Sequence, residues 1–348
     1  MPLARADLTG KIQTVTGLIE PADLGPTLMH EHLLWDIRRP AMQVDPDQGP
    51  PLCPCTYFDI NYGSVKSPNN LVFFDRDLAI DEVRRMREAG GGAIVELSVG
   101  GLKPDPEGLV AISQATDVAI VMGCGHYVEE YQDAANHSRT PEDFAAEMVQ
   151  QLTVGAWGTS VRAGIIGEIG CQSPWTALER RVMQGALMAQ QETGAPLNVH
   201  PGRDEDQPQE VAEFIAAHGG DTSRLILSHI DRTISCEDKL FRLADTGCVI
   251  EFDLFGQEQS LYSLNLQFDL PNDAMRLRMI RRLIERGHLD QIAISHDICY
   301  RSRLQAFGGH GYGHIFRNVL PLMRRRRFTE AEITRIMVET PRRLLTFI

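Results

Sequence analysis

The chain has 348 residues, of which 43% are hydrophobic and 23% are charged, values that are typical of a globular protein with a sizeable core. Its 34 basic and 47 acidic side chains give a formal net charge of -13, which argues against a nucleic-acid partner and against an anionic membrane surface. The first residues lack the apolar segment of a secretory signal and no apolar run is long enough to cross a membrane, so we expect a cytoplasmic protein.

Short strands are predicted along most of the chain. Residues 11–21 alternate between apolar and polar side chains, which predicts a strand pair within the first 25 residues. After this pair, eight runs rich in β-forming residues alternate with longer segments of helical period. The eight runs cover residues 27–33, 91–98, 118–127, 162–170, 195–202, 224–230, 247–256 and 291–298.

The segments between these runs carry the signals of helix ends. Thr140 and Pro141 are an N-cap and a first-turn residue, and Gly194 follows another helical segment. Apolar strands separated by helices predict a parallel sheet covered by helices, and eight such units favour an α/β fold of the (β/α)8 TIM-barrel type. We therefore expect one domain over residues 1–348, with an open doubly wound sheet as the alternative.

A long loop is predicted after the first barrel strand. Residues 38–63 contain five prolines and show no clear period. Loops that follow barrel strands lie at the mouth, where this fold carries its function. We expect this loop to lie over the barrel mouth.

Imidazole and carboxylate side chains stand at the C-terminal ends of the predicted strands, where a metal site is plausible on chemical grounds. His30 and His32 are two residues apart, so both point to one face of a strand. For a lone histidine a hydrogen-bonded, half-buried side chain is the commoner role, but independent strands bring further candidates to the same rim. The candidate ligands are His30, His32, Glu168, His200, His229 and Asp297.

These ligand types suit zinc and its divalent neighbours, including manganese and cobalt. Six ligands exceed the needs of one tetrahedral ion, so we expect two ions, with Glu168 as the candidate bridge.

Seven stretches of the chain together resemble the phosphotriesterase family of the amidohydrolase superfamily, closest to its phosphotriesterase-related branch. They span nearly the whole chain and include residues 17–33, 164–171, 200–203, 227–234, 252–256, 295–298 and 308–315. The resemblance implies an amidohydrolase-type barrel with a binuclear metal centre.

The resemblance also implies the role of each ligand. His30, His32 and Asp297 would hold the more buried ion, and His200 and His229 the more exposed one. Glu168 would occupy the bridging position, where the best-known phosphotriesterases have a carboxylated lysine. Because a glutamate needs no carbon dioxide to mature, we expect activity without bicarbonate.

The branch resembles hydrolases of acyl substrates. We therefore expect a metal-bridging hydroxide to attack an acyl carbon, most plausibly of a small anionic N-acyl amide such as N-acetyltaurine or an N-acyl amino acid. Asp297 would take up the proton and pass it to the leaving group. Lactonase, carboxylesterase and phosphotriesterase (aryldialkylphosphatase) activities are alternatives, as is a ligand-binding protein without catalysis. A deaminase is disfavoured because residues 200–203 read HPGR and lack the glutamate usual there in such enzymes.

Four further side chains are candidate substrate contacts. Arg203 could hold a substrate anion or pair with Asp204 or Glu205. Tyr127 could bond the substrate oxygen or form a wall of the pocket. Tyr312 and His314 lie in a glycine-rich stretch after the last barrel strand, which could reach the substrate or be a structural turn.

Three residues near the ligands are expected to support them. Asp231 and Arg232 could orient the imidazole of His229 or equally form a local salt bridge, and His126 could be an additional ligand or, as we expect, a pocket donor behind the complete ligand set. A homodimer is possible on this sequence.

Overall fold

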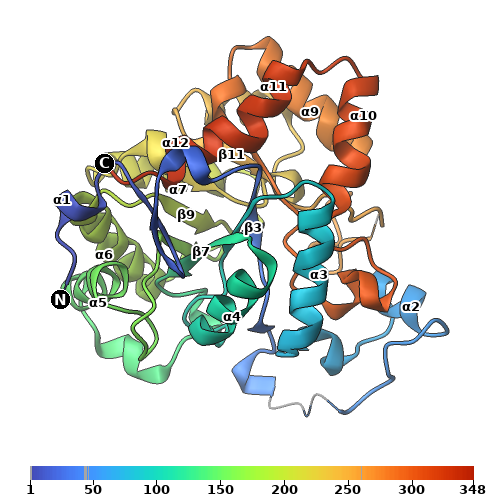
Figure 1. The fold of residues 1–348 in the computed structure, drawn as a ribbon, viewed down its shortest axis with the longest axis horizontal. Helices are drawn as coiled ribbons and strands as arrows, with labels where there is room; N and C mark the ends of the chain where they lie inside the picture. The colour runs from blue at the N-terminus through green and yellow to red at the C-terminus, as the bar shows by residue number, and fades with distance from the viewer. Residues whose placement is uncertain (1, 43–44, 46, 260) are drawn as a thin grey trace.

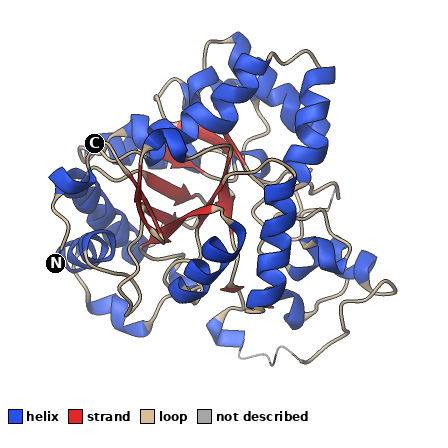
Figure 2. Cartoon of the chain, viewed as in Figure 1, coloured by secondary structure: helices blue, strands red, loops and turns tan. Residues whose placement is uncertain are grey.

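The computed structural model describes residues 2–42, 45, 47–259 and 261–348. Within these residues a single eight-stranded parallel sheet lies at the centre and helices surround it (Figures 1 and 2). The sheet order is β12-β11-β10-β9-β8-β7-β6-β3, the order of the strands along the chain, as a (β/α)8 barrel requires. The strands are β3 (Thr27–Glu31), β6 (Ala93–Glu96), β7 (Ala119–Cys124), β8 (Ile165–Gly170), β9 (Leu197–His200), β10 (Leu225–Leu227), β11 (Val249–Phe252) and β12 (Ile292–Ile294).

The barrel closes between β12 and β3, the two ends of this order. The backbone N–H of Asp297, just after β12, donates to the carbonyl of His30 in β3 at 3.2 Å. This contact confirms the predicted TIM barrel over the open doubly wound alternative.

Helices connect the strands at the predicted places. In α5 (Pro141–Thr153) the Thr140 hydroxyl accepts a hydrogen bond from the backbone N–H of Asp143, and the Asp143 carboxylate accepts one from the backbone N–H of Thr140. This reciprocal cap satisfies donors that a helix start leaves free. A later helix, α6 (Ala177–Thr193), ends as predicted at Gly194. This glycine adopts a φ of 73°, which a residue without Cβ reaches at little cost.

The remaining helices follow the strands in turn. They are α1 (Arg5–Leu8), α2 (Tyr57–Tyr62), α3 (Arg76–Glu88), α4 (Pro106–Thr116), α7 (Gln207–Ala217), α8 (Glu237–Ala244), α9 (Asp273–Glu285), α10 (Leu320–Arg325), α11 (Glu330–Thr334) and α12 (Thr340–Leu345). None of the helices in the described ranges is long and apolar enough to cross a bilayer.

An apolar plug fills the N-terminal end of the barrel. The antiparallel pair β1 (Ile12–Thr14) and β2 (Gly17–Ile19) lies there, and the backbone N–H of Val15 donates to the carbonyl of Ile120 near the start of β7. Ile12 is fully buried against apolar side chains of the strands. Because this end is filled by hydrocarbon, the polar strand ends at the opposite rim are the part of the barrel open to chemistry.

The predicted loop over residues 38–63 contains α2 and packs beside the segment that follows β12. The ring of Tyr57 lies near Gly308, and α2 contacts the turn Arg301–Arg303. Residues 43, 44 and 46 of this loop lie outside the described residues.

A buried ion pair ties α9 to the barrel. Arg276 is 0% exposed, and its Nε donates to Asp231 at 2.7 Å, while Nη1 donates to Asp273 at 3.0 Å and to the carbonyl of Gln257 at 3.1 Å. Asp231 follows β10, so this cluster fixes the helix against the loop that carries His229.

Replacing Arg276 by methionine should destabilise the fold strongly. Because Arg276→Met leaves the Asp231 carboxylate buried without its cation, we expect a loss of about 3–5 kcal/mol in the free energy of unfolding. Urea denaturation followed by circular dichroism measures it. Arg278→Met, on an exposed position of the same helix, is the matched control and should change stability little. Equal urea midpoints for the two variants would show that the ion pair between Arg276 and Asp231 does not stabilise the fold.

Candidate metal centre

The six candidate ligands meet at the C-terminal rim of the barrel. His30 lies in β3, Glu168 in β8 and His200 in β9, while His32, His229 and Asp297 follow the ends of β3, β10 and β12. Three groups of three have ligand atoms within 4.8 Å of one another among the described residues: His30, His32 and Asp297; Glu168, His200 and His229; and His30, His229 and Asp253. The first group is the set that the family resemblance implies for the more buried ion, and the second joins the two histidines implied for the more exposed ion with the bridging candidate Glu168.

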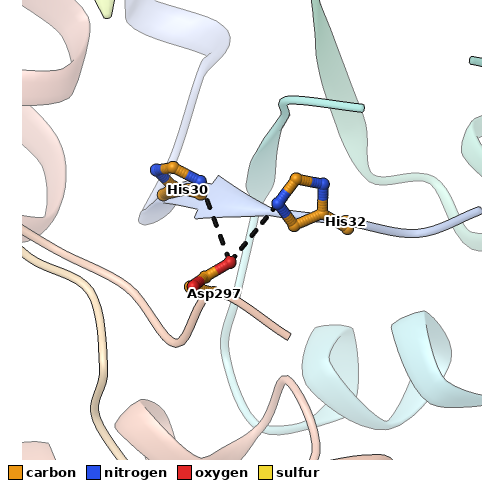
Figure 3. A group of neighbouring side chains, drawn as sticks. All are labelled: His30, His32 and Asp297. Carbon is orange, nitrogen blue, oxygen red and sulfur yellow. Dashed lines mark ion pairs between the residues drawn. The ribbon is translucent and has the colours of Figure 1, made fainter. Parts of the chain in front are cut away.

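The first group is shown in Figure 3, where both imidazoles point at one carboxylate oxygen. Asp297 Oδ1 lies 3.3 Å from His32 Nε2 and 3.9 Å from His30 Nε2. Ligand atoms about 2.0–2.2 Å from a tetrahedral zinc ion are themselves a little over 3 Å apart, so this triad has the spacing of a metal site.

The second group centres on Glu168. Its Oε2 lies 2.8 Å from His200 Nδ1 and 3.4 Å from His229 Nε2. The same carboxylate also faces the first group, since Oε1 lies 3.6 Å from His32 Nε2 and Oε2 lies 3.7 Å from His30 Nε2. Glu168 is therefore the side chain that both groups share.

One atom of the cluster tests directly whether a cation fits. His30 Nε2 is buried and has no hydrogen-bond partner among the described residues, although a buried polar atom is normally paired. It faces the carboxylates of Glu168 and Asp297. A divalent cation between these three groups would satisfy the nitrogen lone pair and both negative charges, so the residues fit a metal ion.

The opposite ring nitrogens of the ligand histidines are held by other side chains. His30 Nδ1 lies 3.1 Å from Ser228 Oγ, and His32 Nδ1 lies 3.0 Å from Ser98 Oγ. Asp253 lies between the two groups, with Oδ2 at 3.3 Å from His30 Nδ1 and Oδ1 at 2.9 Å from His229 Nδ1. Such contacts fix the tautomer and direct Nε2 toward the centre.

The sequence did not assign these three supporting residues. Ser98 and Asp253 stand two positions after Glu96 and Glu251, so strand alternation could have placed them on the inner face.

Burial and mutual charge set the protonation of the centre. Burial alone would raise the pKa of Glu168, but the imidazoles of His30 and His200 hold that pKa well below its usual value. Burial would lower the pKa of His30, whereas the Glu168 carboxylate raises it well above its usual value. The raised pKa of His30 favours a proton at the place where the metal-bound protein would hold a cation.

Two of the ligands hold uncommon backbone conformations. His229 has a φ of 58° and Asp297 a φ of 49°, in the left-handed region that residues with a Cβ seldom adopt. Local strain of this kind is kept where the surrounding structure over-determines it, as at functional sites.

Arg203 and Tyr127 lie beside the second group. The Tyr127 hydroxyl is 3.3 Å from His200 Nε2, and Arg203 Nε donates to the hydroxyl of Tyr262 at 2.9 Å. Glu205, a suggested ion-pair partner of Arg203, instead bonds Ser235 and Lys239. No carboxylate of the described chain forms an ion pair with Arg203.

Two predicted substrate contacts lie elsewhere. Tyr312 is fully buried and its hydroxyl donates to the backbone carbonyl of His32 at 2.5 Å, so its place in the fold favours the alternative of a structural role, in support of the segment that carries His32. His314 has both ring nitrogens engaged, with Asp273 at 2.7 Å and Asn318 at 2.9 Å, which leaves neither free for a substrate.

The predicted supporting residues also need correction. Asp231 does not orient His229; its carboxylate is taken by Arg276, and Asp253 performs that role. Arg232 lies against His200 instead, with Nη2 at 3.2 Å from Nε2. His126 faces α5 through Glu147 at 3.0 Å, away from the cluster.

Comparison with known proteins assigns the family. The model of the phosphotriesterase family matches residues 10–345. The chain belongs to the phosphotriesterase family. As a member of it, the protein is a hydrolase.

The relatives of this family member span almost its whole length. A phosphotriesterase-related protein of Nematostella vectensis is 40% identical over 347 residues, which cover 97% of this chain and 99% of that protein. The N-acetyltaurine hydrolase of Homo sapiens is 38% identical over 355 residues, with coverage of 98% and 99%. Among solved structures, a resiniferatoxin-binding protein from Rhodobacter sphaeroides has a TM-score of 0.91 and 33% identity, with coverage of 99% and 98%.

Metal uptake should become tighter as the pH rises. Because a bound cation displaces the proton of His30, whose pKa is raised, we expect the apparent affinity for Zn²⁺ to rise about tenfold per pH unit between pH 6 and 7. Competition against a chromophoric chelator, corrected for the chelator's own protonation, measures it. An affinity that does not change with pH would show that no ligand of the cluster carries a proton before the metal binds.

Proposed function

We propose that this protein is a binuclear, zinc-dependent hydrolase of small anionic N-acyl amides, of the N-acetyltaurine or N-acyl amino acid type. The observation that carries the proposal is the position of Glu168, which belongs to the group with His200 and His229 and also faces His30 and His32 of the other group. An arginine that forms no ion pair with an acidic side chain of the described chain, Arg203, follows His200 by three residues. The first feature supports two cations, and the second supports an anionic group on the substrate.

The relatives support the same substrate class. The human relative is named an N-acetyltaurine hydrolase, and N-acetyltaurine combines an acyl amide with a sulfonate. A guanidinium matches the geometry of a sulfonate or carboxylate through paired N–H donors. Arg203 is three residues after His200, so in this proposal it holds the substrate anion while the neighbouring amide reaches the cluster.

Each residue of the site has a definite task in this proposal. Two divalent cations, when bound by the triads, would supply an activated water and polarise the acyl oxygen. Burial raises the pKa of Tyr127 well above its usual value, and the nearby Glu168 raises it further. Tyr127 therefore remains a phenol that can donate to the substrate oxygen.

Asp297 is the carboxylate best placed to move a proton. Its side chain is 15% exposed, against 3% for Glu168, so Asp297 is the more accessible of the two carboxylates. Asp297 would accept the proton of the attacking water and deliver it to the leaving amine, which is too basic to depart without one.

A substrate panel tests the proposal. With Zn²⁺-reconstituted protein we expect kcat/KM to be highest for N-acetyltaurine and N-acyl amino acids, ahead of lactones, an aryl acetate and an aryl dialkyl phosphotriester. Arg203→Met should remove the preference for anionic substrates, a loss of about tenfold to a hundredfold, as expected for a charged hydrogen bond of 1.5–3 kcal/mol.

The matched control for this panel is Arg180→Met, which removes an arginine that stacks on Trp175 and pairs with Glu210 on the outer helices. It should leave the preference intact. A lactone or phosphotriester in first place would refute the amide assignment, and an unchanged preference in Arg203→Met would remove Arg203 from anion binding. Two bound metals without turnover of any substrate would favour a binding protein.

Asp297→Asn tests the proton transfer. At equal metal content we expect kcat to fall about 10²- to 10⁴-fold, the usual contribution of a general acid–base group. Single-turnover kinetics, with metal content determined on the same sample, measure the effect. Asp290→Asn, an exposed aspartate after α9, is the control. A kcat near the wild-type value would exclude Asp297 from the proton transfer.

A further inference from the structure

A buried carboxylate lies at the seam of the barrel. Glu31 stands between the candidate ligands His30 and His32 in the sequence, and the alternation of a strand turns its side chain away from theirs, toward Ser295 and His296. It is 0% exposed. No lysine or arginine of the described residues forms an ion pair with it, and its one basic neighbour is the imidazole of His296.

Four hydrogen bonds satisfy this carboxylate, and all four come from the other side of the seam. Oε1 accepts from Ser295 Oγ at 2.8 Å, from the backbone N–H of His296 at 3.0 Å and from His296 Nδ1 at 2.7 Å. Oε2 accepts from the backbone N–H of Ile298 at 3.1 Å. Burying a carboxylate is costly unless its lone pairs are used in this way.

The bonds of Glu31 enclose Asp297. The residues before and after Asp297 both donate their backbone N–H to this carboxylate, and Asp297 itself has a φ of 49°. Its own N–H donates to the carbonyl of His30. The segment that carries Asp297 is thus held in a strained conformation by contacts with the strand that carries His30 and His32.

Backbone pairing between β3 and β12 does not fix the position of Asp297. β3 and β12 are the two ends of the strand order, and β12 already ends at Ile294. His296 extends the connection, since its Nε2 accepts from the backbone N–H of Ile315 at the start of the next helical segment. The position of Asp297 relative to the two histidines therefore depends on the Glu31 side chain.

We propose that Glu31 is a positioning residue for the His30, His32 and Asp297 triad, and that it sets the affinity of this triad for its cation. The inference rests on the proposed binuclear function. Ligand atoms must keep their mutual distances within a few tenths of an ångström to bind a cation well, and Glu31 is the group that spans both halves of the triad.

The test compares Glu31→Gln with Glu82→Gln. Glu82 is also buried and accepts backbone N–H groups of the segment after β12, from Gln305 at 2.9 Å and Ala306 at 2.8 Å, but it touches neither Asp297 nor the ligand strand. Both substitutions keep the side-chain shape and place an NH₂ group against donors. Glu82→Gln also removes the acidic partner of Arg85, so its structural cost is at least comparable, while only Glu31→Gln acts on the triad.

Zn²⁺ binding to each folded variant, measured by chelator competition and elemental analysis, gives the decisive quantity. We expect Glu31→Gln to bind one of its two ions about 10- to 100-fold more weakly, the usual effect of losing a contact behind a metal ligand. The other ion, on the Glu168, His200 and His229 side, should change much less. Glu82→Gln should bind both ions with wild-type affinity, even though its thermal midpoint falls.

A milder variant keeps the proposal testable if Glu31→Gln does not fold. Ser295→Ala removes one of the four hydrogen bonds and leaves the carboxylate, so we expect a loss of about two- to fivefold in the affinity for the same ion. Wild-type affinity for both ions in either variant would overturn the proposal and make Glu31 a purely structural residue. A wild-type protein that binds fewer than two ions would instead refute the binuclear function on which the proposal rests.

Discussion

The structure of the metal centre depends on how two buried carboxylates, those of Glu168 and Asp297, are compensated by positive charge inside the barrel. Glu168 and Asp297 face each other's histidines in a space that water hardly enters, and an isolated buried carboxylate is strongly unfavourable. In the protein without metal the raised pKa of His30 favours a proton there, which offsets part of this negative charge. A divalent cation offers the same compensation with shorter and more directional contacts, and the orphaned Nε2 of His30 marks where it is needed.

A second set of carboxylates does the positioning. Asp253 contacts the imidazoles of His30 and His229, one from each ligand group, so the two groups share a support as well as the central Glu168. Glu31 points to the outside of this ligand cluster, and its hydrogen bonds join β3, the first barrel strand, to the segment after β12, the last one. The alternation of a strand separates these tasks, because His30 and His32 point inward while Glu31 between them points to the seam.

Much of the fold and of the ligand set follows from local sequence. The eight strands, their helices and the caps at Thr140 and Gly194 depend on period and on end signals, which are encoded within a few residues. The six candidate ligands were found because parallel strands bring their C-terminal ends to one rim. Spacing alone was sufficient for that inference, and the family resemblance then divided them between two ions.

The remaining residues could not be assigned in this way because their partners are distant in the chain. Asp231 looked like the support of its neighbour His229, yet Arg276, 45 residues later, takes its carboxylate. Tyr312 looked like a substrate contact in a glycine-rich loop, yet its hydroxyl reaches the carbonyl of His32, 280 residues earlier. Loop geometry decides such contacts, and loop geometry depends on tertiary packing instead of local period.

The net negative charge of the whole molecule bears on how Arg203 could recognise an anionic substrate. A chain with a net charge of -13 repels an anionic substrate at long range, although salt at physiological strength screens that repulsion beyond about 8 Å. Discrimination must then come from charges that touch the substrate. Arg203 has a phenol, Tyr262, as its partner, and a phenol leaves the positive charge uncompensated. An anionic substrate would provide this compensation. A buried charge needs an opposite charge nearby: at the triads this requirement favours a bound cation, and at Arg203 it favours a bound anion.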